Sequence, residues 1–336
     1  MDAKCKTVTA YSVSHFAVDF ACAFLVLRFF GNRADTAMLC LIYNFFAFAM
    51  QLPMGIMADK LNRNSLVALC GCIFVSVSYL TLCVFPPILV CTMLGVGNGL
   101  FHIGGGIDVL NLSGNKSALL GVFVSPGALG LYLGKLAGAS GSFSAAIAPI
   151  GVLFCGILCI LVCGTEKSDN PAPSFDGVGK NGVLAVTCFF LVVLIRTYMG
   201  LTMDFPWKAS YPIILTLAVV LGKTAGGFIG DALGFKRAAV ITLVPSAVLF
   251  FFSENPFCGI LAVFLFNMTM PMTLFASYEI FRQSGGFAFG LLTFSMYLGL
   301  LPVYYGLICT GSASYILFTA ASLFILLFGL GREDKK

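Results

Sequence analysis

The sequence predicts an all-α polytopic membrane protein with twelve transmembrane helices in two pseudo-symmetric six-helix bundles. Its 336 residues are 59% hydrophobic and only 10% charged, whereas a soluble protein carries roughly 25% charge. Apolar runs of about 20 residues recur from end to end, which is the length that crosses a bilayer as a helix. A charged turn after the second run has a second copy about half a chain later, which indicates a duplicated unit.

The limits of the apolar runs define the expected organisation. The twelve expected helices are 8–30, 36–58, 65–84, 87–110, 117–139, 143–164, 182–203, 209–230, 237–253, 257–277, 287–309 and 312–331. The longest break lies between the sixth and seventh runs and contains Pro171, Pro173 and several charges. We therefore expect an N-terminal bundle over 1–164, a cytoplasmic linker over 165–181 and a C-terminal bundle over 182–336.

Charge placement tests this topology independently. With the N-terminus inside, thirteen basic residues fall in cytoplasmic segments: Lys4, Lys6, Lys60, Arg63, Lys116, Lys167, Lys180, Lys236, Arg237, Arg282, Arg332, Lys335 and Lys336. Only Arg33 and Lys208 fall in outside loops. This asymmetry is what the positive-inside rule requires, so we expect both termini on the cytoplasmic side of the cell membrane.

The duplicated stretch places a glycine four residues before an aspartate, and a turn former and basic residues after it. The first copy contains Gly55, Asp59, Lys60, Asn62 and Arg63, and the second contains Gly227, Asp231, Gly234, Lys236 and Arg237. The two aspartates are 172 residues apart. Both copies resemble the motif that joins the second to the third, and the eighth to the ninth, helices of the major facilitator superfamily.

That resemblance implies a role in gating. In the superfamily the glycine permits close helix approach, and the aspartate and basic residues form a cytoplasmic charge cluster that helps hold one conformation. The first copy has Asn62 where glycine is usual, a mild change because Asn tolerates positive φ. It also has Asn64, and the second has Ala232, in place of a basic residue. The sequence does not decide which basic residue each aspartate meets.

Small residues mark helix contacts at a spacing of four. The fifth expected helix carries Gly130, Gly134 and Gly138, and the eighth carries Gly222, Gly226 and Gly230. Such ladders let backbones approach closely in a membrane. In the superfamily these two helices meet across the halves, which suits a rocking motion, although static packing explains the ladders equally well. The Ser125-Pro126-Gly127 sequence removes a backbone donor within the fifth helix and should bend it.

Ionisable side chains deep in the expected helices are functional candidates, because an isolated charge there costs several kcal/mol. Asp19 lies near the middle of the first helix, His15 is one turn away on the same face, and His102 lies within the fourth. These patterns resemble the fosmidomycin-resistance-type transporters, with Ile103 replacing the proline usual after the histidine. Imidazole exchanges protons near neutral pH, so we expect a proton-coupling trio. A buried network that only joins two helices is the alternative.

Three deep cations set the expected sign of the substrate. Arg196 lies in the seventh helix, Lys223 in the eighth and Lys135 in the fifth, against Asp19 as the one carboxylate near the midplane. Their functional interpretation is recognition of an anionic group in a central cavity. The alternatives are pairing of Arg196 or Lys223 with Asp19 or a carbonyl, and extension of Lys135 to the outer surface.

Together these features, with the resemblance, predict a transporter and not an enzyme. We expect alternating access with proton-coupled export or exchange of a small organic anion, phosphonate-like or carboxylate, by a monomer in the bilayer. The closest alternative is a multidrug:proton antiporter for lipophilic cations, in which Asp19 binds the substrate. A membrane-embedded enzyme and a receptor that has lost transport are further alternatives. The 13 cysteines are scattered with no histidine at metal spacing, so we expect no cofactor or metal and no nucleic-acid partner.

Overall fold

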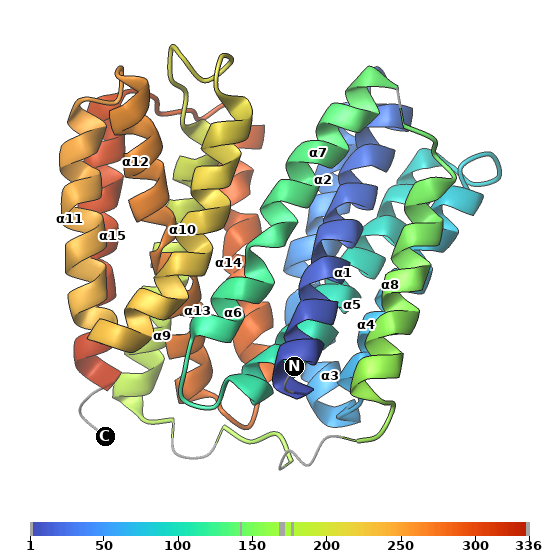
Figure 1. Ribbon diagram of the computed structural model, residues 1–336, viewed down its shortest axis with the longest axis horizontal. Helices are drawn as coiled ribbons and strands as arrows, with labels where there is room; N and C mark the ends of the chain where they lie inside the picture. The colour runs from blue at the N-terminus through green and yellow to red at the C-terminus, as the bar shows by residue number, and fades with distance from the viewer. Residues whose placement is uncertain (1–2, 142, 168–171, 176–177, 334–336) are drawn as a thin grey trace. The chain divides into compact units, whose positions relative to one another are not determined.

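The structure is a computed structural model, and it describes residues 3–333 except 142, 168–171 and 176–177. The expected linker lies partly outside these residues, as do Lys335 and Lys336. The described residues contain helices and no strand (Figure 1). Nine helical segments are long and apolar enough to cross a membrane, and two apolar helices of 17 residues, α4 and α8, are shorter.

The described helices of the first half form six rods in chain order, where a rod is one helix or a run of consecutive helices that continue one another. Their bounds are α1 Ala3–Leu25 with the π-helical η1 Val26–Phe30; α2 Thr36–Asn44, η2 Phe45–Ala49 and α3 Gln51–Leu61; α4 Asn64–Leu80; α5 Pro87–Ser113; α6 Ala118–Val124 and α7 Pro126–Ser140; and α8 Ile147–Cys163. The fifth rod is interrupted at Ser125, directly before Pro126, where the sequence predicts a bend.

The described part of the second half forms six further rods. Their bounds are α9 Lys180–Thr202, α10 Pro212–Leu233, α11 Phe235–Phe251, α12 Pro256–Asn267 with α13 Thr269–Ile280, α14 Gly285–Tyr304 and α15 Ser312–Glu333. Apolar side chains on every side of these helices are what a membrane bundle requires, because lipid and neighbouring helices are both apolar surroundings.

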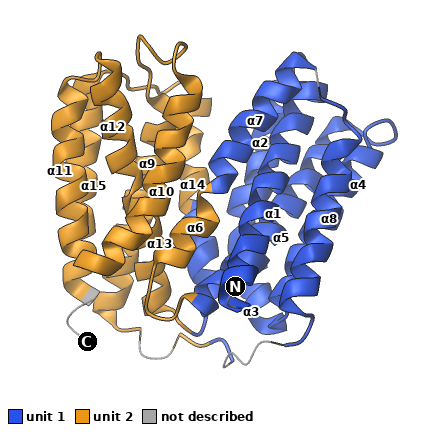
Figure 2. Ribbon diagram, in the orientation of Figure 1, with its two compact units in different colours: residues 1–112, 126–173, 283–294 blue, residues 113–125, 174–282, 295–336 orange. Residues whose placement is uncertain are grey.

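The chain forms two compact units, shown in Figure 2. Unit 1 comprises residues 1–112, 126–173 and 283–294, and unit 2 comprises 113–125, 174–282 and 295–336. If the units divided at the linker, residues 113–125 would belong to the first unit and residues 283–294 to the second. In the structure each of these two segments belongs to the other unit. The interrupted fifth rod and α14 each begin in one unit and end in the other.

Within unit 1, α1 packs against α7 and α8, and α4 packs against α8. The glycine ladder of α7 explains the closest of these contacts: a Cβ on Gly130 or Gly134 would collide with the carbonyl oxygens of Phe16 and Phe20 on α1. A Cβ on Gly138 would lie 2.9 Å from the carbonyl oxygen of Phe24. The ladder therefore lets two backbones of the same unit meet, as small residues do in membranes.

Within unit 2, α10 packs against α12, α13 and α6, while α15 packs against α9 and α11. Gly222 and Gly226 of α10 lie against the carbonyl oxygens of Phe264 and Met268. The contact between the fifth and eighth rods is made by α6, where a Cβ on Gly121 would lie 2.9 Å from the carbonyl oxygen of Lys223. Each ladder thus packs against a helix of its own unit.

Candidate functional site

The three residues expected to couple protons lie together in unit 1. The Nε2 atoms of His15 and His102 are 2.8 Å apart, and the Asp19 carboxylate lies 3.3 Å from His15 Nε2 and 3.7 Å from His102 Nε2. The side chains of His15 and His102 are 7% and 11% exposed, and that of Asp19 is 19% exposed. Asp19 is therefore the member of the network most open to exchange.

Hydrogen bonding fixes where the protons lie in this network. His102 Nδ1 is 2.8 Å from the carbonyl oxygen of Asn98, four residues earlier on α5. A carbonyl only accepts, so Nδ1 of a neutral His102 carries the proton and its Nε2 is the acceptor toward His15. In this arrangement the proton on His15 Nε2 lies between His102 Nε2 and the Asp19 carboxylate.

Helices α1 and α5 carry the three residues of this network, and their neighbouring residues pack closely around it. Asn98, which the sequence analysis passed over, donates from Nδ2 to Asp19 Oδ1 at 3.1 Å. Its spacing of four from His102 within one helix is the signal that could have identified it. From α7, Gly127 completes the enclosure, because a Cβ there would collide with His15 Nε2 and Asp19 Oδ2.

The same atoms were tested as a metal site. The ligand atoms of His15, Asp19 and His102 lie within 4.8 Å of one another, so they could hold a divalent ion. Ligand atoms around tetrahedral zinc are about 3.3 Å apart, given Zn–N distances near 2.0–2.1 Å. The 2.8 Å separation of the two imidazole nitrogens is instead a hydrogen-bond distance. The geometry therefore favours a shared proton over a metal.

In unit 2, Arg196 of α9 faces a cavity of about 200 Å³. The cavity is lined by Arg196, Gly200, Met203, Phe205, Lys208, Leu215, Val219, Val263, Phe266 and Asn267. Among the described residues, the guanidinium has one hydrogen bond, to Thr273 Oγ1 at 3.4 Å, and no ion pair. The lining contains two cationic side chains and no carboxylate, so the described cavity is suited to an anion.

Lys208 was expected in an outside loop, and its role in this cavity was missed. Its Nζ donates to the carbonyl oxygen of Met203 at 2.5 Å, which directs the side chain back toward α9. Lys223 is half-buried on α10, one turn beyond the cavity-lining Val219 and on the same helix face. Lys135 is exposed on α7, in unit 1. Within unit 2 the structure thus brings Lys208 to the cavity that Arg196 lines.

The first copy of the duplicated motif caps a helix within unit 1. The two Asp59 oxygens accept from the backbone N–H groups of Gly286 and Phe287, at 2.7 and 2.9 Å, in the first turn of α14. Gly55 makes this possible, because a Cβ there would collide with the carbonyl oxygen of Gly286. Asn62 ends α3 with φ of 53°, as its tolerance of positive φ predicts.

The second copy does the same within unit 2. Asp231 accepts from the backbone N–H groups of Ser117 and Ala118, at 2.6 and 3.0 Å, where α6 begins. The turn former Gly234 has φ of 77°. Helix N-termini carry partial positive charge and unpaired donors, so a carboxylate is the group that satisfies them.

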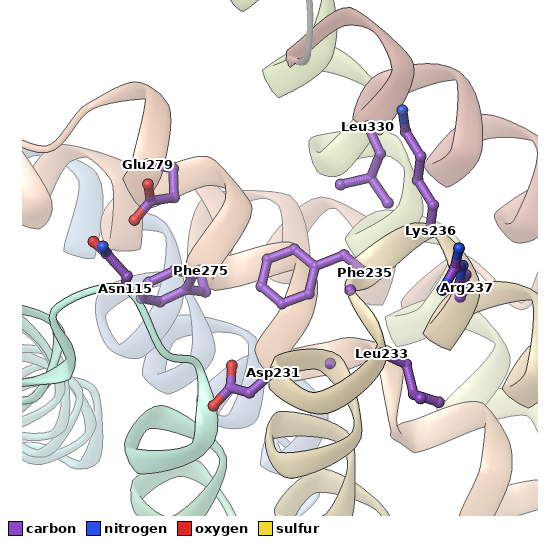
Figure 3. A pocket seen from close by; sticks show the side chains of 11 residues that line it. Asn115, Asp231, Leu233, Phe235, Lys236, Arg237, Phe275, Glu279 and Leu330 are labelled. Carbon is purple, nitrogen blue, oxygen red and sulfur yellow. The ribbon is translucent and has the colours of Figure 1, made fainter.

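The second motif also borders a cavity of about 550 Å³, shown in Figure 3. Asp231 and Glu279 lie on one side of Phe235 in this view, and Lys236 and Arg237 lie on the other. Glu279 forms an ion pair with Arg282 at 2.6 Å. This cavity is lined by charges of both signs, so its lining gives no preference for one ligand charge.

Comparison with known proteins identifies the fold. No protein-family model matches the sequence, and no curated protein matches it. Solved structures match over nearly the whole chain. The human organic anion transporter MFSD10 is similar with a TM-score of 0.73 and 14% identity, over 98% of this chain and 100% of that one.

Two structures of the transporter FucP are similar as well. FucP of the major facilitator superfamily in the outward conformation has a TM-score of 0.67 and 13% identity, over 98% of this chain and 99% of that one. A variant of the E. coli fucose:proton symporter FucP has a TM-score of 0.67 and 12% identity with the same coverage. The chain therefore has the fold of major facilitator superfamily transporters.

Proposed function

We propose that this chain is a secondary active transporter of the major facilitator superfamily that exports or exchanges a small organic anion coupled to protons. The observation that carries the proposal is Arg196, a guanidinium within the helices of unit 2 that faces a cavity and has no acidic partner among the described residues. A charge in that position is costly unless a partner satisfies it. A phosphonate-like or carboxylate substrate supplies that partner, since guanidinium binds both in a fork geometry.

Proton coupling is assigned to His15, Asp19 and His102. A proton on His15 can pass to His102 or to Asp19 with a small rearrangement, because His15 Nε2 lies 2.8 Å from His102 Nε2 and 3.3 Å from the Asp19 carboxylate. Alternating access then exposes the network and the anion cavity to each side of the membrane in turn. The two capping motifs, with Asp59 and Asp231, hold the first turns of α14 and α6 in one state and release them in the other.

The fold supports this assignment. It is shared with an organic anion transporter and with a proton symporter, so it accommodates both parts of the proposed cycle. Within the superfamily we place the chain nearest the fosmidomycin-resistance type, on the pattern of His15, Asp19 and His102. Lys223 is assigned a supporting role beside the anion cavity, and Lys135 a role in attracting anions to the outer surface. The protein acts as a monomer in the cell membrane, with both termini in the cytoplasm and no enzymatic activity.

A flux measurement tests the proposal. The protein is reconstituted in liposomes that contain a pH-sensitive dye, and small phosphonates and carboxylates are compared with lipophilic cations of similar size. We expect anion gradients to move protons in the wild type. Arg196→Gln should lower the apparent affinity roughly 10- to 100-fold, so most of that response is lost at the substrate concentration that half-saturates the wild type. Arg28→Gln is the matched control, because Arg28 is an exposed arginine at the end of the first rod.

Two results would contradict the proposal. Proton movement triggered only by lipophilic cations, and lost in Asp19→Asn, would reject the anion proposal in favour of a multidrug:proton antiporter. Anion-driven flux that is unchanged in Arg196→Gln would show that transport does not depend on this cavity. Lys208→Gln should lower the apparent affinity by about tenfold, as the loss of one charged hydrogen bond predicts.

A further inference from the structure

A second half-buried carboxylate, Asp108, lies in unit 1 and takes no part in the proposed cycle. It is near the end of α5, and its two oxygens accept from Tyr11 Oη at 2.5 Å and from Asn64 Nδ2 at 2.8 Å. Both donors are neutral. The described residues provide no ion pair for this carboxylate, so its negative charge is hydrogen-bonded but not balanced.

Asp108 lines a cavity of about 270 Å³ that lies within unit 1, between the ends of α5 and α8 and the start of α4. Asn64, only 3% exposed, lines the same cavity. Because Asn64 Nδ2 donates to Asp108, Oδ1 is the amide atom that remains to accept. That Oδ1 is buried and has no hydrogen-bond partner among the described residues. A buried acceptor of this kind requires a donor or a cation.

A third oxygen in the cavity lining is also limited to accepting. Ser65 is 5% exposed, and its hydroxyl donates its proton to the carbonyl oxygen of Gly164 at 2.6 Å. Its lone pairs therefore remain for another partner. The cavity thus combines one carboxylate with two neutral oxygens that have no proton to give. Oxygen-only sites of this kind favour hard cations over transition metals.

We propose that Asp108, Asn64 Oδ1 and Ser65 Oγ bind a sodium ion in this cavity. One carboxylate with neutral oxygens balances one positive charge, so the site selects a monovalent over a divalent cation. The bound ion joins α4 and α5, and through Tyr11 it also stabilises α1. Lys167 and Glu166 line the same cavity but are exposed, so they lie at its rim and are not needed for the charge balance.

Thermal unfolding of the full-length protein in detergent tests the site without any transport assay. The probe is NaCl, titrated against choline chloride at constant ionic strength. Ligand binding to the folded state raises the Tm with ligand concentration. We expect a saturable rise of about 3 °C or more in the wild type and none in Asp108→Asn. Ser65→Ala should require several-fold more sodium for the same rise.

Matched variants separate the site from its surroundings. Glu166→Gln removes a carboxylate at the rim and should leave the sodium response unchanged. Asn64→Asp adds a second carboxylate in the same position and should make CaCl2 more effective than NaCl. The Tm of each variant in choline chloride shows whether it is folded, so a misfolded Asp108→Asn leaves the Asn64→Asp and Ser65→Ala results to decide.

Three results would overturn the proposal: no sodium response in the wild type, a full response retained in Asp108→Asn, or a response lost in Glu166→Gln. The first would mean that a proton or Lys167 balances Asp108. Because these measurements contain no substrate, failure of the proposed transport function would leave them unaffected. Binding of 22Na⁺ at one ion per chain, lost in Asp108→Asn, would confirm the site directly.

Discussion

The interiors of the two units differ in how their charges are satisfied. In unit 1, His15, Asp19 and His102 satisfy one another, with Asn98 as a further donor. In unit 2, Arg196 faces a cavity with no carboxylate among its described lining. A closed network can pass a proton without any other ligand, whereas an unbalanced cation requires one from outside. Under the proposed function, proton handling belongs to unit 1 and anion recognition to unit 2.

Removing the carboxylate from the network should produce the largest effect. Asp19→Asn keeps the side-chain size but removes the charge that stabilises a proton on His15, 3.3 Å away. We expect substrate-driven proton movement to fall to the level of empty liposomes, measured with an internal pH dye. Anion binding should change by no more than about twofold, because the recognition site is in unit 2. Asp204→Asn, at an exposed loop carboxylate, should behave as the wild type.

Removing the charge of Arg196 in unit 2 should instead lower the affinity for the anion. Arg196→Gln removes a charged donor, which costs about 1.5–3 kcal/mol or roughly 10- to 100-fold in affinity. Arg196→Lys should retain part of that affinity because charge remains but the fork geometry is lost. Isothermal titration with the transported anion measures both. Equal affinity in the glutamine variant would show that the division between the units is wrong.

The fold was predicted from the sequence and is confirmed, whereas the roles of the site residues remain predictions. The twelve helices, the break at Pro126 and the positive φ at Asn62 follow from local chemistry, so the sequence predicted them. The trio of His15, Asp19 and His102 was also predicted, because an ionisable group in a membrane helix needs a partner.

What remained hidden depends on contacts between distant segments. The motif aspartates could not be assigned to a backbone N–H partner, because the partner helix begins more than 100 residues away. Lys208 follows the seventh helix in a segment that composition assigns to solvent, and only the fold returns it to Arg196. The sequence did not indicate that Gly127 lies against the network, because its role depends on having no side chain.

Gly127 provides a steric test of the unit 1 network. Gly127→Ala places a methyl group against His15 Nε2 and Asp19 Oδ2, and overpacking of this kind costs about 1–3 kcal/mol. We expect a lower Tm and slower proton movement, with unchanged anion affinity. Gly151→Ala on α8 is the matched control, because a Cβ there meets nothing within 4 Å. Loss of function in both variants would point to a general effect of alanine in these helices.

The smallest expected effect on stability concerns a feature that both units share, the capping aspartate. Asp59 and Asp231 each cap the first turn of another helix with two backbone hydrogen bonds. Asp59→Asn and Asp231→Asn remove the charge but leave an acceptor, so each should cost about 1 kcal/mol or less. The decrease should be slightly larger for Asp231→Asn, because Asp231 also accepts from Ser117 Oγ at 2.9 Å.

The control for this pair is a carboxylate that caps no helix through its side chain. Asp35 is such a residue, in the loop before α2, where hydrogen bonds from Arg33 hold the pKa of the Asp35 carboxyl below its ordinary value. Exposed ion pairs contribute little to stability, so Asp35→Asn should leave the Tm unchanged. A much larger effect at one motif than at the other would show that the duplicated turns have diverged in function. Effects of similar size would mean that the units share a gating device and differ only in what their interiors bind.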